Sequence, residues 1–206
     1  ERVSEGDVLI IHGCCHNPSG IDLDQTAWEA IAAQARAKNL ICLVDFAYQG
    51  FDEGLEEDRA GLHVLLNAGL AVLVTSSYSK NFSLYSERIG ALSVFCPQAG
   101  QAANVLGQLK LTVRRNYSSP ARNGALLVAH VLNDDKLATQ WRAEVEEMRV
   151  RVRDMRVKLA SQLKSAVPDQ DFSFLLRQNG MFGYTGLTSA QVDRLREEFG
   201  VYAVGT

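Results

Sequence analysis

Short apolar runs and amphipathic stretches alternate along the first hundred residues. The apolar runs predict strands, which cover residues 7–12, 40–46, 70–76 and 89–96. Apolar positions at helical spacing predict helices between them, at about residues 24–38 and 58–68. Either Asp22 or Asp24 can cap the first of these helices. Alternation of this kind predicts an α/β fold with a mostly parallel sheet covered by helices.

The second half of the chain has a different pattern. Helices are expected at residues 98–112, 118–132, 134–165 and 189–199. Short strands are expected around the last of them, at residues 172–174, 180–184 and 201–204. The pattern therefore predicts a larger domain over residues 1–147 and part of a smaller α/β domain over 148–206. The long helix at about 134–165 joins the two.

One lysine follows a predicted strand in a setting that suits cofactor chemistry. Lys80 lies just beyond the strand at 70–76, at the carboxyl end of the sheet, where open α/β folds bind ligands. Its amine can hold the aldehyde of pyridoxal 5'-phosphate as an imine. Ser77, Ser79 and Arg88 offer hydroxyl groups and a guanidinium for the phosphate. A lone lysine in a polar loop is ordinarily a solvated surface charge, so the prediction depends on further residues.

Those residues follow the two preceding strands. Asp45 ends the strand at 40–46, where a carboxylate is costly unless a cation such as a pyridinium nitrogen meets it. Tyr48 and Asn17 can hydrogen-bond the phenolic oxygen of the same ring. Each has a simpler explanation, because Asn17 suits a turn, Asp45 can cap a helix and Tyr48 can fill space. Together with Lys80 and Arg88, they favour a site for pyridoxal 5'-phosphate.

Three motifs resemble those of the class I aminotransferases, and the similarity covers essentially the whole chain. They are His16-Asn17-Pro18-Ser19-Gly20, Asp45-Phe46-Ala47-Tyr48-Gln49-Gly50-Phe51, and Ser77-Tyr78-Ser79-Lys80 with Arg88-Ile89-Gly90. Within that family the chain is most similar to the bacterial aspartate and aromatic amino acid enzymes. The segment Arg115-Asn116-Tyr117-Ser118-Ser119-Pro120 is closer to the aromatic branch.

The resemblance implies a fold type I architecture and a role for each of these residues. Lys80 is the Schiff-base lysine and proton shuttle, Asp45 the partner of the pyridine nitrogen, and Tyr48 and Asn17 the partners of the phenolic oxygen. Ser77, Ser79 and Arg88 hold the phosphate. Asn17 also borders the substrate, and Arg114 crosses a homodimer interface to receive a substrate's side-chain carboxylate. Residues 1–147 then form the C-terminal portion of the large cofactor-binding domain.

The implied reaction is ping-pong transamination from an aromatic amino acid to 2-oxoglutarate, with aspartate as a second candidate donor. Two alternatives stay open: lyase or decarboxylase chemistry on the same fold, and a noncatalytic binding segment. Family members are about twice this long, so the chain resembles a fragment that lacks the N-terminal half and the C-terminal end. We expect the isolated fragment to be inactive.

Composition agrees with an ordinary globular protein of 206 residues, with 47% hydrophobic residues, 22% charged residues and a net charge of −3. We expect no nucleic-acid or membrane partner, because there is no basic tail and no apolar run of about 20 residues. Four cysteines without framework spacing suit a reducing compartment, and we expect a cytoplasmic protein. Four candidate ligands crowded into residues 12–16 cannot easily surround zinc, so no metal site is expected.

Overall fold

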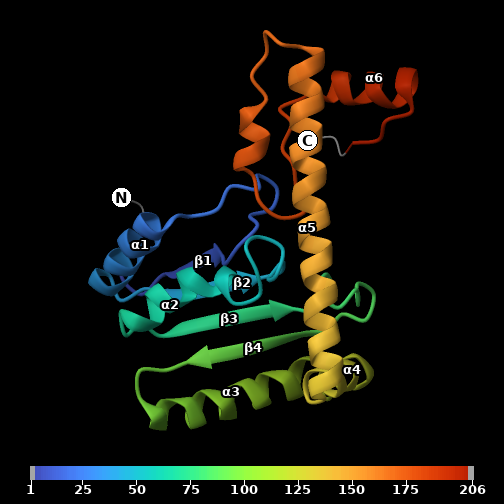
Figure 1. Cartoon of the computed structure of the whole chain (residues 1–206). Helices are drawn as coiled ribbons and strands as arrows, with labels where there is room; N and C mark the ends of the chain where they lie inside the picture. Colours follow the sequence, from blue (N-terminus) through green and yellow to red (C-terminus); the bar gives the residue numbers. More distant parts are fainter. Residues whose placement is uncertain (1–2, 204–206) are drawn as a thin grey trace.

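The computed structural model describes residues 3–203 and contains a four-stranded sheet in the order β1-β2-β3-β4 (Figure 1). The strands are β1 Val8–His12, β2 Ile41–Phe46, β3 Val72–Ser77 and β4 Gly90–Phe95. The first three strands are parallel, whereas β4 is antiparallel to β3. The four predicted strands and the mostly parallel sheet are therefore confirmed.

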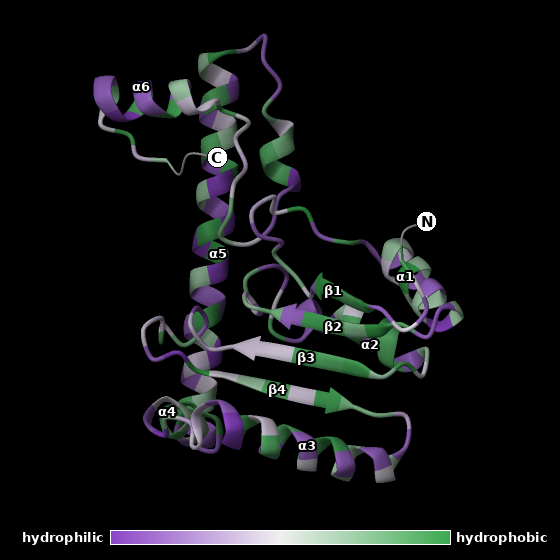
Figure 2. Cartoon of the chain, turned by 180° about the vertical axis from the view of Figure 1, so that it is seen from behind, coloured by the Kyte–Doolittle hydropathy of each residue, from purple (hydrophilic) through white to green (hydrophobic). Residues whose placement is uncertain are grey.

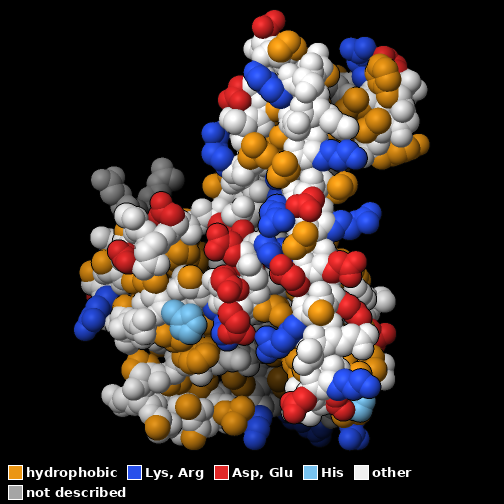
Figure 3. Space-filling model, in the orientation of Figure 1, with side chains coloured by type: hydrophobic (Ala, Val, Ile, Leu, Met, Phe, Trp, Pro, Cys, Tyr) orange, Lys and Arg blue, Asp and Glu red, His pale blue; other side chains and the backbone are white. Residues whose placement is uncertain are grey.

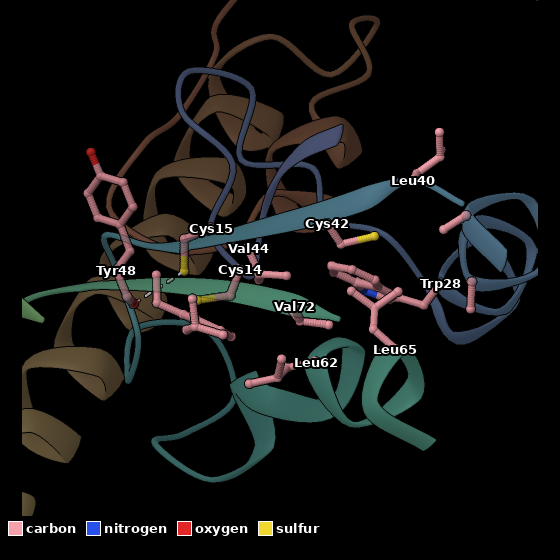
Figure 4. Close-up of a cluster of buried hydrophobic side chains, with 14 of the residues drawn as sticks. Cys14, Cys15, Trp28, Leu40, Cys42, Val44, Tyr48, Leu62, Leu65 and Val72 are labelled. Atoms are coloured by element: carbon pink, nitrogen blue, oxygen red, sulfur yellow. Dashed lines mark hydrogen bonds between the residues drawn. The ribbon is translucent and has the colours of Figure 1, made fainter. Parts of the chain in front are cut away.

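Helices α1 (Gln25–Ala37) and α2 (Ala60–Asn67) cover one face of the sheet. Asp24, not Asp22, caps α1, because its Oδ1 accepts from the Ala27 N–H at 2.8 Å. Buried side chains from both helices and the sheet form one core, which Figure 4 shows. They include Trp28, Leu62, Leu65, Cys42, Val44 and Val72.

The opposite face of the sheet carries no helix in Figure 2. Because strand side chains alternate, every second residue faces this side. Ile10, on β1, is 67% exposed, and Val8, Ile41 and Leu92 on the same face are also exposed. His12, Asp45 and Thr75 lie opposite one another in register on this face, at the carboxyl ends of the parallel strands.

Three helices follow the sheet: α3 Ala99–Tyr117, α4 Asn123–Leu132 and α5 Asp135–Ala166. α3 extends five residues beyond its predicted end, and α4 begins after the serine-proline turn rather than within it. α5 has the predicted length and runs from α4 past the sheet to the far end of the molecule. No helix in the described part of the chain is long and apolar enough to cross a membrane.

The segment beyond α5 differs from the expectation. Residues 173–177 form a 3₁₀ helix, η2 (Ser173–Arg177), so the strand predicted at 172–174 is wrong. Residues 180–184 and 201–203 have no strand structure either, and Val204 lies outside the described residues. The helix α6 (Ser189–Phe199) is confirmed, with a capping box at Thr188 and Gln191.

Candidate active site

Lys80, Tyr48 and Asn17 come together at the carboxyl edge of the sheet. The Lys80 Nζ lies 4.4 Å from the centroid of the Tyr48 ring. The Asn17 amide Nδ2 donates to the Tyr48 hydroxyl at 3.4 Å, which leaves the phenol proton free for another acceptor. Burial raises the pKa of Tyr48, and the Asp45 carboxylate adds to this effect, whereas the Asn17 hydrogen bond lowers it. Tyr48 is therefore a neutral hydrogen-bond donor near pH 7.

Asp45 occupies the end of β2, one strand away from the lysine loop. Its Oδ1 accepts from the Thr75 hydroxyl at 2.8 Å, across the parallel β2–β3 pair. Among the described residues, no further side chain donates to this carboxylate, so its second oxygen can receive an N–H from a ligand. Thr75 was not identified from the sequence, although it is the direct cross-strand neighbour of Asp45.

The predicted phosphate anchors lie where β3 ends and β4 begins. Ser77 Oγ accepts from the Ser79 N–H at 3.2 Å, and Ser79 is buried. Ser77 pairs with Gly90 across the sheet, which places Arg88 close to the end of β3. Glycine is needed at this crossing, because a Cβ at position 90 would lie 2.7 Å from the Ser76 carbonyl oxygen. The exposed Arg88 guanidinium donates to the Tyr85 carbonyl at 2.9 Å.

Arg114 is not part of this group. It lies in the last turn of α3 and donates to the Ser118 hydroxyl at the end of the same helix. Both side chains are exposed. The Arg114 side chain is therefore exposed to solvent and bonded within the end of its own helix.

Two buried or half-buried aspartates shape the loops that carry Asn17 and Tyr48. Asp22 accepts from the backbone N–H groups of Cys15 and His16 at 2.7 and 2.8 Å. Asp58 accepts from four backbone N–H groups, those of Gly50, Asp52, Glu53 and Gly54, at 2.7 to 3.4 Å. Neither role was predicted, and the only sequence signal is a carboxylate near a glycine-containing turn.

Cys14, Cys15 and Asp58 lie within 4.8 Å of one another and are buried. The hydrogen bond to Cys15 and burial raise the pKa of the Cys14 thiol, so it stays protonated. The Asp58 oxygens are already occupied by backbone N–H groups. The Cys15 thiol instead donates to the Tyr48 carbonyl at 3.9 Å, as Figure 4 shows. This cluster therefore supports the Tyr48 loop and lacks the free ligands that a metal ion needs.

The donor set suits pyridoxal 5'-phosphate. An amine, a neutral phenol, an amide and an incompletely bonded carboxylate lie at neighbouring strand ends, with two serines and an arginine beside them. These are the groups that an aldehyde, a phenolic oxygen, a pyridinium nitrogen and a phosphate require. The fold and the site together define an α/β protein with a ligand site at the carboxyl edge of its sheet.

The sequence matches the family described as aminotransferase class I and II over residues 1–206. The chain belongs to this family. It is 54% identical over 199 residues to an aromatic-amino-acid aminotransferase of Escherichia coli (strain K12). It is 47% identical over 199 residues to an aspartate aminotransferase of Pseudomonas aeruginosa. Each match covers 97% of this chain and 50% of the relative, so the chain spans about half the length of these curated relatives.

The fold is also shared with solved structures. A crystal structure of an aromatic-amino-acid aminotransferase from Burkholderia pseudomallei, covalently bound to pyridoxal phosphate, superposes with a TM-score of 0.95 at 49% identity. The match covers 98% of this chain and 51% of that one. The predicted fold class and family are therefore confirmed.

Proposed function

We propose that this chain supplies the cofactor-binding core of a pyridoxal phosphate-dependent aminotransferase. The observation that carries the proposal is the Lys80 amine over the Tyr48 ring, with the Asn17 amide on the Tyr48 hydroxyl. When bound, the cofactor supplies an electron sink for the substrate carbanion. The relatives named for aromatic amino acids and for aspartate support an amino acid donor and a keto acid acceptor.

The residues act on the cofactor and the substrate in different ways. Lys80 holds the cofactor and moves the α-proton of the substrate, as a general base must lie within reach of that proton. Asp45 keeps the ring nitrogen protonated, and Thr75 orients this carboxylate through its hydroxyl. Tyr48 and Asn17 bind the phenolic oxygen. Because the Asn17 amide donates to the Tyr48 oxygen, the Tyr48 hydroxyl proton is directed away from Asn17 and can be donated to the cofactor.

Ser77, Ser79 and Arg88 hold the phosphate at the β3–β4 edge. Asn17 also borders the substrate. Arg114 acts in the neighbouring subunit of a homodimer, where it receives a side-chain carboxylate of the substrate. The Arg114 side chain is exposed, bonds the end of its own helix and is distant from Lys80 in the sequence, which supports a role across a subunit interface. Residues 1–147 then belong to the large domain and 148–206 to the small domain, with α5 between them.

Aromatic amino acids are the proposed donors and 2-oxoglutarate the acceptor. Aspartate is the second candidate donor, because relatives named for aspartate are 46 to 47% identical to this chain. We place the protein in the cytoplasm, in agreement with four free cysteines, of which three are buried. These 206 residues alone are proposed to have negligible turnover, because the open sheet face and the exposed Arg88 leave the site accessible to water.

The direct test is to map the lysine that holds the cofactor. The full-length protein is incubated with pyridoxal 5'-phosphate, reduced with borohydride and digested, and the modified peptide is identified by mass spectrometry. We expect a dominant adduct at Lys80, its loss in Lys80→Ala and its retention in Lys110→Ala, which changes an exposed lysine on α3. An adduct that survives Lys80→Ala unchanged contradicts the assignment.

Product analysis then tests the reaction class, with phenylalanine and aspartate compared as donors. Formation of a keto acid together with glutamate is the expected result. Release of ammonia or carbon dioxide without glutamate would overturn transamination in favour of lyase or decarboxylase chemistry. The ratio of kcat/KM for the two donors decides between the aromatic and aspartate preferences.

A further inference from the structure

The residue directly after Lys80 is held by a tryptophan of α5, 60 residues further along the chain. The indole Nε1–H of Trp141 donates to the Asn81 backbone carbonyl at 2.7 Å. This distance is at the short end of the range for an N–H···O bond. Asn81 is buried, whereas Lys80 is half-buried. The backbone next to the lysine is therefore bonded to a helix that is distant in sequence.

The ring of the same tryptophan packs against the next residue of this loop. The Phe82 and Trp141 rings are stacked, with their centroids 4.6 Å apart and their planes at 24°. Phe82 also meets the Tyr78 ring edge-on, at 5.5 Å between centroids. Aromatic pairs in these geometries attract each other beyond the area that they bury. Trp141 therefore contacts the chain after Lys80 directly, and through Phe82 it supports the chain before Lys80.

Two further hydrogen bonds define the loop that carries Lys80. The Ser83 N–H donates to the Lys80 carbonyl at 3.1 Å, which closes a turn. The side-chain amide of Asn81 donates to the Gln49 carbonyl at 3.2 Å. Because Gln49 follows Tyr48 directly, this second bond ties the loop that carries the lysine to the loop that carries the tyrosine.

Helix α5 holds both loops from one face. Trp141 and Val145 are four residues apart and therefore lie on the same side of the helix. Val145 is buried and packs against Gly50, where a Cβ would lie 2.7 Å from Val145 Cγ1. Arg142 and Glu146, which follow them, are exposed, and Figure 3 shows acidic and basic side chains where α5 passes the sheet. The two loops therefore rest against neighbouring turns of one helix.

The contact between Trp141 and Asn81 does not lie in a close-packed core. Two cavities, of about 560 and 210 Å³, are each lined by both residues. A close-packed interior fixes a side chain from all sides, whereas cavities border this pair. The position of the backbone after Lys80 therefore depends on the indole hydrogen bond and the stacked rings more than on general packing.

We propose that Trp141 is a positioning residue for Lys80. The indole holds the backbone that follows Lys80, while Val145 holds the loop that carries Tyr48. The lysine amine is thereby kept at the Tyr48 ring, 4.4 Å from its centroid. The link to catalysis rests on the proposed function, in which Lys80 moves the α-proton of the substrate. The tie between α5 and the loop does not depend on it.

The other tryptophan of the chain separates positioning from general stability. Trp28 lies in the core, packed among α1, α2 and the sheet, and is more deeply buried than Trp141. The same substitution, Trp28→Phe, should therefore lower the stability of the fold at least as much as Trp141→Phe does. It does not touch the loop that carries Lys80, so it is the matched control.

The first test uses the full-length protein without cofactor. Trp141→Phe keeps an aromatic ring for Phe82 but removes the N–H donor to Asn81. Amide hydrogen exchange at residues 81–84 should become on the order of fivefold faster, which is the effect of one typical hydrogen bond on a local equilibrium. The Ser83 amide is the direct reporter, because it bonds the Lys80 carbonyl. Mass spectrometry of peptides from this region measures the exchange.

Two further variants decide what a change in exchange means. Trp28→Phe should leave exchange at residues 81–84 unchanged, and equal acceleration there would overturn the proposal in favour of a general loss of stability. Unchanged exchange in Trp141→Phe refutes the tie. Phe82→Leu removes the stacked ring from the side of the loop and should also speed exchange, so it decides the question if Trp141→Phe does not fold.

The second test asks whether the tie positions the Lys80 amine. In the cofactor-loaded full-length protein, the half-reaction with the amino acid donor is followed in a single turnover, with hydrogen or deuterium at the α-carbon. Trp141→Phe should slow this step on the order of fivefold and raise the isotope effect, because a less well placed amine slows the proton transfer. Trp28→Phe should keep the isotope effect of the unchanged protein. An unchanged isotope effect in Trp141→Phe overturns the positioning role.

The two tests also separate this inference from the proposed function. If borohydride gives no adduct at Lys80 in the unchanged protein, the proposed function fails, and the cofactor-free exchange still shows whether Trp141 holds the loop. If the adduct forms but exchange at residues 81–84 does not respond to Trp141→Phe, the inference fails and the proposed function stands.

Discussion

The sheet of residues 8–95 and the segment of residues 167–203 contain similar short apolar runs, but only the runs in the sheet become strands. β2 has β1 and β3 as hydrogen-bonding partners on its two sides, and all three belong to the same stretch of chain. Within residues 3–203, no strand lies beside residues 173–177, which satisfy their backbone locally as a 3₁₀ helix. A strand therefore needs a partner as well as an apolar pattern.

The two regions are also stabilised by different interactions. The sheet packs a contiguous apolar core against α1 and α2, with Leu65 and Val44 fully buried. The segment beyond α5 buries fewer apolar side chains, among them Leu175 and Val192, and adds polar contacts to them. Arg156 donates to the carbonyls of Gly180 and Phe182 at 2.6 and 2.8 Å, and the Gln178 side chain exchanges two hydrogen bonds with the Tyr184 backbone. Mutations in the core of the sheet should therefore lower the stability of the whole fold, whereas mutations beyond α5 should destabilise only that segment.

The largest effect is expected in the core of the sheet. Leu65→Ala removes a side chain with no solvent exposure and leaves a cavity beside Trp28. The free energy of unfolding should fall by about 2–5 kcal/mol. Urea denaturation measures this loss. The control Leu176→Ala changes a leucine of η2 that is 53% exposed and should stay within about 0.5 kcal/mol. Equal losses at the two positions would contradict the contrast between the regions.

Two glycines of the second region provide a matched pair. Gly180 and Gly186 have φ values of +72° and +73°, so alanine is strained at both. A Cβ at position 180 would also lie 2.4 Å from Cys15 Cβ, whereas nothing lies within 4 Å at position 186. Gly180→Ala should cost about 2–4 kcal/mol and Gly186→Ala about 1 kcal/mol. Thermal unfolding compares them, and similar costs would show that the Cys15 contact is unimportant.

Removal of the arginine contact should loosen the segment without affecting the sheet. Arg156→Met keeps an apolar stem but leaves the Gly180 and Phe182 carbonyls without their donor. The local cost should be about 1.5–3 kcal/mol. Hydrogen exchange should become faster at residues 178–184 and remain unchanged in β2. Arg153→Met is the control, because Arg153 is exposed and donates to the neighbouring Asp154. Faster exchange in β2 would mean that the two regions are not separable.

The smallest effect is expected at the start of α6. Thr188→Ala removes the capping hydroxyl that accepts from the Gln191 N–H at 3.3 Å. The loss should be about 0.5–2 kcal/mol, confined to α6. Thr185→Ala, in the exposed turn before it, should have a smaller effect on the same helix. Exchange protection of α6 amides is the measurement, and a loss that spreads into the sheet would argue against local stability.

The sequence predicted the features that neighbouring residues determine. The four strands of the sheet, the helix α6 with its polar start and the long helix α5 follow from periodicity and capping residues. The motifs around Asn17, Asp45 and Lys80 indicated the family, which the comparisons confirm. The roles of these residues stay proposals. Their positions at three strand ends made the prediction possible, because parallel strands bring such ends to one edge.

Only the tertiary structure decided which distant groups meet. It placed Thr75 on Asp45 and Asp22 under the Asn17 loop, whereas Asp24 caps α1. It also turned the expected strand at 172–174 into η2. Helix caps and strand patterns depend on residues a few positions apart, so the sequence displays them directly. Contacts between loops depend on how whole elements pack, and a carboxylate at one position has no local signal that names its partner thirty residues away.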